Sequence, residues 1–197
     1  MNRTADVARK TAETDITVRV DLDGDGSCDV ATGIGFFDHM LTHVAHHGRF
    51  GLTVRAQGDV HVDDHHTVED VGIALGTALR NALGDCSGIV RMGHAFAPMD
   101  EALVLCAIDV SGRGILVCEL DLPTPRLGDY TTELTPEFFR AVAHNAGWTL
   151  HLKQISGSNT HHLVEAAFKA FARAARIAVS YDPRMTGIPS TKGVLGE

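Results

Sequence analysis

Short segments in which hydrophobic and polar residues alternate form the first regular pattern along the chain. They occur in two sets, at 16–22 with 27–32 and at 102–110 with 115–120. Alternation with a period of two predicts β-strands, and the glycine-containing turn inside each set predicts a hairpin. One further short strand is expected later in each set, at 52–56 and 149–153.

Segments with helical periodicity follow these strands. The apolar stripe of the first helix has the spacing i, i+3, i+4, i+7 and consists of Phe37, Met40, Leu41 and Val44. The corresponding helix of the second set is expected to begin after Thr135-Pro136, because proline is favoured in the first helical turn. An alanine-rich helix then closes each set, at 65–83 and 161–179.

The two sets are copies of one unit. The segment "HHTVEDVGIALGTALRNAL" (65–83) aligns with "HHLVEAAFKAFARAARIAV" (161–179), "HHGRFGLTV" (46–54) with "HNAGWTLHL" (144–152), and "DGDG" (23–26) with "SGRG" (111–114). Glu13 falls opposite Glu101 in the same alignment. Three matches in one order indicate a duplication.

Strands followed by helices on one face predict an α+β fold in which each repeat has two layers. We expect the repeats to span 1–88 and 89–182, with a mobile C-terminal tail at 183–197, and to form one functional domain together.

Composition narrows the class of protein. Hydrophobic residues make up 44% of 197 residues, enough for a sizeable core. No apolar run approaches the roughly 18 residues of a membrane span, and no secretory signal is visible. Four cysteines without a CxxC pair are typical of free thiols in a cytoplasmic protein. A net charge of −8 argues against nucleic-acid binding, and a membrane partner is not expected.

Twelve histidines are the unusual feature of the composition. A single histidine is most often a solvated polar residue, but here His-His-x-Val-Glu occurs twice. Residues three or four apart share a helix face, so His66 with Glu69, and His162 with Glu165, could each chelate an ion. His65 and His161 point about 100° away, which favours a second ion.

The upstream helices add further candidate ligands. His39, His43 and His46 recur at helical spacing, and the duplication places Glu137 opposite His39. Imidazole and carboxylate without thiolate suit Mn, Fe, Zn or Co. A repeat kept only for helix packing would explain the alanines but not the clustered histidines and glutamates.

Several motifs together resemble the imidazoleglycerol-phosphate dehydratases of histidine biosynthesis. They are "GIGFFDHMLTHVAHHG", "DDHHTVEDVGIALG", "MDEAL", "SGRG", "THHLVEAAFKAFARA" and "PSTKG", in this order. The resemblance implies a duplicated left-handed βαβ-type unit, like domain 2 of ribosomal protein S5, with helices covering each sheet. It also implies assembly into a homo-24-mer, and the length leaves no room for the phosphatase domain of bifunctional relatives.

The resemblance further implies two Mn²⁺ per active site, held between subunits, with other divalent metals able to substitute. One ion would be bound by His39, His66, Glu69 and, from a neighbour, His161. The other would be bound by His65, Glu137, His162 and Glu165. Glu137 departs from the family pattern, which has histidine at that position in many relatives.

The implied reaction is dehydration of D-erythro-imidazole-glycerol phosphate to imidazole acetol phosphate by a hydro-lyase. The expected path runs through a metal-bound imidazolate and a diazafulvene-like intermediate, with Glu13 and Glu165 as acid/base groups. The residues implied in substrate binding are His43, His47, Arg91, Arg113, Ser190 and Lys192. The tail is expected to become ordered over the substrate.

Two other functions remain open at this stage. A dinuclear metallohydrolase could use the same ligands to activate water against a phosphorylated small molecule. A metal-storage or scaffold shell would explain the histidines but not Arg113 or "PSTKG". The product formed from imidazoleglycerol phosphate, an enolisable ketone or free phosphate, separates the three.

Overall fold

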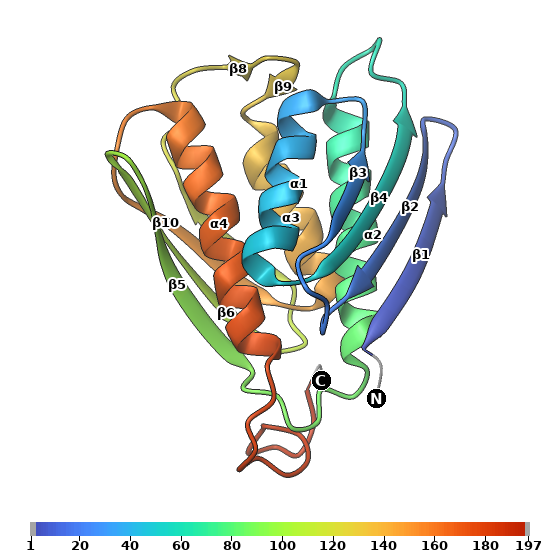
Figure 1. Ribbon diagram of the computed structural model, residues 1–197, viewed down its shortest axis with the longest axis vertical. Coiled ribbons are helices and arrows are strands. Elements are labelled where there is room, and N and C mark those ends of the chain that lie inside the picture. The colour runs from blue at the N-terminus through green and yellow to red at the C-terminus, as the bar shows by residue number, and fades with distance from the viewer. Residues whose placement is uncertain (1–2, 196–197) are drawn as a thin grey trace.

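The computed structural model describes residues 3–195 and has two four-stranded sheets on the outside with four helices between them (Figure 1). The first repeat consists of β1 (Thr4–Lys10), β2 (Thr14–Asp21), β3 (Cys28–Ala31), α1 (Gly35–Gly48), β4 (Gly51–Gly58) and α2 (His65–Leu83). The second consists of β5 (Met92–Met99), β6 (Ala102–Asp109), β7 (Ile115–Glu119), α3 (Leu134–Ala146), β10 (Thr149–Ser156) and α4 (Thr160–Val179). A small hairpin of β8 (Arg126–Leu127) and β9 (Tyr130–Thr131) precedes α3.

Both sheets have the same topology, which confirms the predicted duplication and the α+β class. Their strand orders are β1-β2-β4-β3 and β5-β6-β10-β7. In each repeat the last two strands named are parallel neighbours joined through a helix, so β3-α1-β4 and β7-α3-β10 are βαβ units. The other neighbouring pairs of these sheets are antiparallel.

The two predicted hairpins are wrong. β4 lies between β2 and β3, and β10 lies between β6 and β7. The glycines that suggested tight turns instead allow a close crossing: a Cβ on Gly24 would lie 2.2 Å from the backbone nitrogen of Gly51, where β4 begins. The hairpins of the two four-stranded sheets are β1–β2 and β5–β6, and the alternation pattern did not predict β1 or β5.

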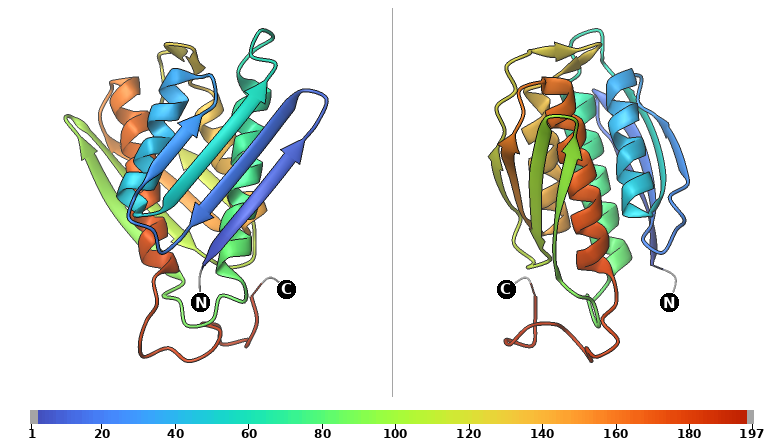
Figure 2. Two further views of the ribbon diagram at one scale, coloured as in Figure 1. Left: turned by 45° about the vertical axis from the view of Figure 1, so that its right-hand side comes forward. Right: turned by 60° about the vertical axis from the view of Figure 1, so that its left-hand side comes forward.

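The helices of the two repeats pack against each other across the middle of the molecule, α1 on α4 and α2 on α3 (Figure 2). Gly72 and Gly76 bring α2 close to the backbone of α3, because a Cβ on Gly76 would lie 2.6 Å from the carbonyl oxygen of Val142. The alanine-rich faces and the aromatic residues Phe138, Phe168 and Trp148 are buried there.

Two further observations bear on the sequence predictions. Cys28, Cys86, Cys106 and Cys118 are free thiols, as expected. Within residues 3–195, each helix is too short or too polar to cross a membrane.

Candidate functional site

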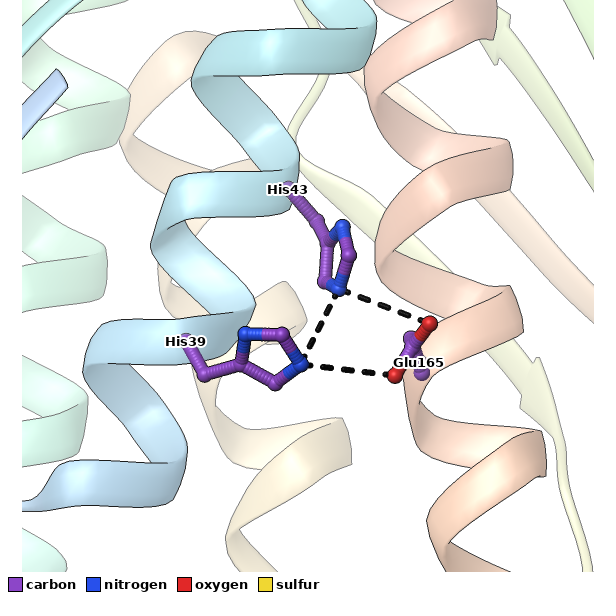
Figure 3. Close-up of side chains that lie close together, drawn as sticks. All are labelled: His39, His43 and Glu165. Carbon is purple, nitrogen blue, oxygen red and sulfur yellow. Dashed lines mark hydrogen bonds and ion pairs between the residues drawn. The ribbon is translucent and has the colours of Figure 1, made fainter.

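Three histidine rings surround one buried carboxylate between α1 and α4, a group that we call the α1–α4 cluster (His39, His43, His161, Glu165). The Nε2 atoms of His39, His43 and His161 lie 3.5, 3.5 and 3.4 Å from the carboxylate oxygens of Glu165. Figure 3 shows His39 and His43 of α1 pointing toward Glu165 of α4, with their Nε2 atoms 3.2 Å apart. One donor atom from each of His39, His43 and Glu165 lies within 4.8 Å of the others, a spread that suits binding of one metal ion.

The charges of this cluster are set by burial and by Lys169. Glu165 is 5% exposed. Burial raises the pKa of Glu165, but a hydrogen bond from Lys169 and the neighbouring positive charges outweigh it and lower that pKa to about 2. Burial lowers the pKa of His43 to about 4 despite the nearby Glu165. His43 is therefore neutral at pH 7, and Lys169 is the charged partner that keeps Glu165 ionised.

This arrangement predicts how stability depends on pH. The pKa of Glu165 is lowered from 4.5 to about 2, so its charged form contributes stability that is present above pH 4.5 and is lost as the pH falls toward 2. Replacing Lys169 with methionine leaves a buried carboxylate unpaired, so we expect a loss of about 3 kcal/mol at pH 7. The stability lost on acidification from pH 7 should be smaller in the same variant, because without Lys169 burial raises the pKa of Glu165.

Urea unfolding of metal-free protein at pH 7 and pH 3.5 measures both effects. Lys10→Met is the matched control, because Lys10 pairs with Asp15 on the surface, where ion pairs contribute little. If Lys169→Met and the unaltered chain lose the same free energy of unfolding between pH 7 and pH 3.5, Lys169 is not the group that keeps Glu165 ionised.

The second histidine of each pair is held from the side by a carboxylate. Nδ1 of His66 lies 3.1 Å from Asp59 Oδ2, and its Nε2 lies 3.8 Å from Glu13 Oε1. Nδ1 of His162 lies 2.7 Å from Glu101 Oε2. Hydrogen bonds to Asp59 and Glu101, respectively, raise the pKa of His66 and of His162.

Local contacts place these groups at the start of α2 and α4. Asp70 on α2 accepts hydrogen bonds from Arg9 and from the hydroxyl of Thr14, which ties the β1–β2 hairpin, and with it Glu13, to α2. Asn159 caps α4 and accepts a hydrogen bond from the backbone N–H of His162.

Helix α2 of the first repeat and helix α3 of the second carry His65, Glu69 and Glu137 near one another. Nε2 of His65 lies 3.8 Å from Glu69, and Glu137 forms an ion pair with Arg140. Glu69 and Glu137 line the same surface depression. In each His-His pair it is therefore the first histidine, at i, i+4, that approaches the glutamate, whereas the sequence analysis paired the second.

Ligands that the sequence analysis assigned to one ion are distributed over different parts of the chain. His39 lies on α1 against α4, whereas His66 and Glu69 lie on α2, which packs against α3. His43 belongs to the α1–α4 cluster, and the ring of His47 stacks on the ring of His43, with centroids 5.5 Å apart.

The residues expected to bind phosphate gather elsewhere, in a group that we call the phosphate cluster (Arg91, Arg113, Ser190, Lys192). Arg91 donates to Asp109 Oδ1 at 2.7 Å and to the carbonyl oxygen of Pro189 at 2.9 Å. Arg113 Nη2 lies 4.0 Å from the same Asp109. The hydroxyl of Ser190 accepts a hydrogen bond from the backbone N–H of Lys192.

The phosphate cluster and the α1–α4 cluster lie at opposite ends of α4. The backbone N–H of Arg91 donates to the carbonyl oxygen of Ala178, in the last turn of α4, whereas His161 is in the first turn. At 1.5 Å per residue this separation is about 25 Å. In Figure 1 the C-terminal segment likewise lies beyond the C-terminal end of α4.

Asp59, Asp109 and Lys169 were not identified from the sequence, and Glu101 was noted only as the counterpart of Glu13. Lys169 could have been found from its i, i+4 spacing to Glu165. Asp59, Glu101 and Asp109 reach His66, His162 and Arg91 only through the tertiary fold.

The fold and the site define a duplicated α+β protein that combines imidazole–carboxylate groups with a separate set of cations, and the proteins that it resembles are hydro-lyases. The family model described as imidazoleglycerol-phosphate dehydratase matches residues 32–175. The dehydratase of Desulforamulus reducens is 62% identical over 195 residues, covering 99% of this chain and 100% of that protein.

Solved structures agree with this assignment. The crystal structure of the Staphylococcus aureus dehydratase has a TM-score of 0.83 at 39% identity, covering 91% of this chain and 99% of that one. That of Pyrococcus furiosus has a TM-score of 0.83 at 36% identity, covering 96% and 100%. The chain belongs to the imidazoleglycerol-phosphate dehydratase family, and it is a hydro-lyase of histidine biosynthesis that acts on a phosphorylated imidazole substrate.

Proposed function

We propose that this chain dehydrates D-erythro-imidazole-glycerol phosphate to imidazole acetol phosphate, with two Mn²⁺ in each active site and residues from several chains of a homo-24-mer in the cytoplasm. The observation that carries the proposal is the separation of two complementary groups. One end of the folded molecule carries ligands that could hold metal ions against an imidazole ring, and the opposite end carries cations that could bind a phosphate group.

The donor atoms of the described residues fit manganese. They are nitrogens and carboxylate oxygens without thiolate, and three of them converge within 4.8 Å in the α1–α4 cluster. The residues that would hold the two ions are His39, His65, His66, Glu69, Glu137, His161, His162 and Glu165. When bound, manganese would hold the imidazole ring of the substrate and stabilise negative charge on its nitrogens.

The carboxylates of the chain would move the protons. Dehydration breaks one C–O bond and one C–H bond, so one group must protonate the departing hydroxyl and one must accept the carbon-bound proton. Glu13 lies on the Nε2 side of His66, where a ligand of that nitrogen would be placed. Glu165 is ionised at neutral pH, and it would have to move away from its metal ion to accept a proton. The resulting enol becomes the ketone without further help from a second substrate.

Phosphate binding would come from the phosphate cluster. Asp109 holds Arg91 from one side and lies near Arg113, so it aligns the guanidinium groups while leaving a net positive charge with Lys192. Arginine suits this role because its planar donors match phosphate oxygens.

The site must be completed by neighbouring chains. The substrate is about 10 Å long from ring nitrogen to phosphate oxygen, from bond lengths of about 1.5 Å. It cannot span the roughly 25 Å between the first and last turns of α4. A second copy that brings its phosphate cluster to the histidines of the first removes this difficulty.

The outer faces of the two sheets differ in a way that supports self-association. The face of β1-β2-β4-β3 carries ion pairs such as Arg19–Asp6 and Arg55–Asp29. The face of β5-β6-β10-β7 exposes Met92, Phe96, Ile115 and Val117. Exposed apolar side chains of this size are enriched at protein–protein contacts, so we assign this face to another copy of the chain.

Phe96→Glu is therefore expected to break the assembly into smaller species. Phe96 is 52% exposed on this face, so the substitution should not disturb the folding of the single chain. Light scattering after size exclusion measures the mass. Thr17→Glu, on the outer face of the other sheet, is the matched control and should keep the mass of the unaltered chain. An unchanged mass for Phe96→Glu would remove this face from the proposal.

The test of the activity is incubation of the protein with Mn²⁺ and imidazoleglycerol phosphate. We expect an enolisable ketone that retains its phosphate, and no reaction after chelation. Release of inorganic phosphate would instead support a metallohydrolase, and metal uptake without either product would support a storage shell.

A further inference from the structure

The two β-hairpins that carry Glu13 and Glu101 occupy equivalent places in the duplicated fold. Glu13 lies in the turn between β1 and β2, and Glu101 in the turn between β5 and β6, and the repeats align these two residues. Each carboxylate lies beside the second histidine of the local His-His pair, His66 or His162. The two glutamates nevertheless contact different nitrogens of their histidines.

Glu101 is fully engaged as a hydrogen-bond acceptor. Its Oε2 accepts from His162 Nδ1 at 2.7 Å. Its Oε1 accepts from the backbone N–H groups of Asn159 at 2.9 Å and Ser158 at 3.3 Å. These contacts fix the carboxylate to the start of α4, so Nδ1 of His162 carries a proton and the neutral ring would offer Nε2 to a ligand.

In the first repeat a different residue makes the equivalent contact. Both carboxylate oxygens of Asp59, at the end of β4, lie 3.1 and 3.2 Å from Nδ1 of His66. The backbone N–H of Asp59 donates to the carbonyl oxygen of Glu13 at 3.1 Å, which holds the hairpin in place. The side chain of Glu13 is thereby placed on the opposite side of the ring, 3.8 Å from Nε2.

We propose that Asp59 and Glu101 are the positioning residues of the two repeats, which hold the Nδ1–H of His66 and His162 so that each Nε2 faces a metal ion. Because Asp59 holds the ring in the first repeat, Glu13 is released from the position that Glu101 occupies in the second and can transfer protons. The two glutamates that the duplication makes equivalent thus have different roles: Glu101 positions a histidine, and Glu13 transfers protons. This inference rests on the proposed metal-dependent function.

The physical basis is the tautomer of the imidazole. A histidine that binds metal through one nitrogen usually donates its other N–H to a carboxylate or a carbonyl group, and loss of that partner typically weakens metal affinity 10–100-fold. Asp59→Asn or Glu101→Gln keeps the size of the side chain but can present an amide donor to Nδ1. That contact would place the proton on Nε2, where it competes with the metal.

The experiment is a titration of full-length, assembled protein with Mn²⁺, in which the electron paramagnetic resonance signal of the free ion reports binding at any particle size. Asp59→Asn should weaken half of the binding equivalents about 10–100-fold and Glu101→Gln the other half. Asp59→Glu and Glu101→Asp, which restore a carboxylate, should recover part of the affinity. Glu13→Gln should bind Mn²⁺ with the affinity of the unaltered chain.

Asp63→Asn is the matched control, because Asp63 accepts a hydrogen bond from the backbone N–H of His65 and should leave affinity unchanged. The circular dichroism of each variant shows that it is folded, and Asp59→Asn tests the idea by itself if Glu101→Gln fails to fold. Unaltered Mn²⁺ affinity in Asp59→Asn, or an equal loss in Glu13→Gln, would overturn the inference alone. Failure of the unaltered chain to bind Mn²⁺ would overturn the proposed metal dependence and the inference with it.

Discussion

Replacing Glu13 with glutamine is expected to lower kcat by about 10²–10⁴-fold, the contribution typical of a general acid or base. Glu13 lies in the β1–β2 turn, and its carboxylate faces the Nε2 side of His66 from 3.8 Å. Glutamine has nearly the same shape but cannot accept and return a proton. The hairpin itself should persist, because Asp70 ties it to α2 through Arg9 and Thr14.

Steady-state kinetics of Glu13→Gln, together with metal content and particle mass, test this expectation. Metal content and mass should match those of the unaltered chain, so that the loss is confined to turnover. Asp6→Asn removes a carboxylate from a surface ion pair with Arg19 on the outer face of the β1-β2-β4-β3 sheet and should leave kcat unchanged. Near-normal turnover in Glu13→Gln would exclude Glu13 as the proton-transfer group.

Removal of residues 190–197 is expected to weaken substrate binding by two to four orders of magnitude. The deletion removes Ser190 and Lys192, and charge-assisted hydrogen bonds contribute about 1.5–3 kcal/mol each. Two such bonds correspond to roughly 10²–10⁴ in affinity. The contact of Arg91 with the carbonyl oxygen of Pro189 remains, so the rest of the phosphate cluster should keep its position.

Binding of imidazoleglycerol phosphate to the truncated chain, measured by calorimetry, gives the affinity directly, and urea unfolding shows whether the fold is intact. Arg184→Gln removes a cation of the same segment that pairs with Asp182, and it should leave the affinity unchanged. Equal affinity of the truncated and complete chains would leave phosphate recognition to Arg91 and Arg113.

The duplicated α+β fold could be predicted from the sequence because its strongest signals are local. His-His-x-Val-Glu and the alanine-rich periodicity occur in both α2 and α4, and both helices begin with the histidine pair and bury their alanines. The order of strands could not be predicted in the same way. A glycine-rich turn shows where the chain reverses, but whether β3 pairs with β2 or with the later β4 depends on contacts across the sheet.

The histidines and glutamates of the site were recognisable by residue type and helical spacing, but their partners were not. Asp59 reaches His66 from the end of β4, and Glu101 reaches His162 from a hairpin, so neither contact has a fixed sequence spacing. The distance between the metal ligands and the tail, by contrast, follows from the length of α4 alone, since the ligands lie in its first turns and the tail begins after its last.

The central claim is that each active site combines the metal-binding end of one chain with the phosphate cluster of another. Mixed assemblies of two impaired chains, Glu13→Gln and the deletion of residues 190–197, test it most directly when the substrate concentration is too low for the truncated chain to bind it. If the two groups come from different chains, about a quarter of the sites in a random one-to-one mixture have both intact, and activity should return to about a quarter of that of the unaltered chain. If one chain supplies both groups, every site carries a defect, and a mixture as inactive as its components would contradict the account.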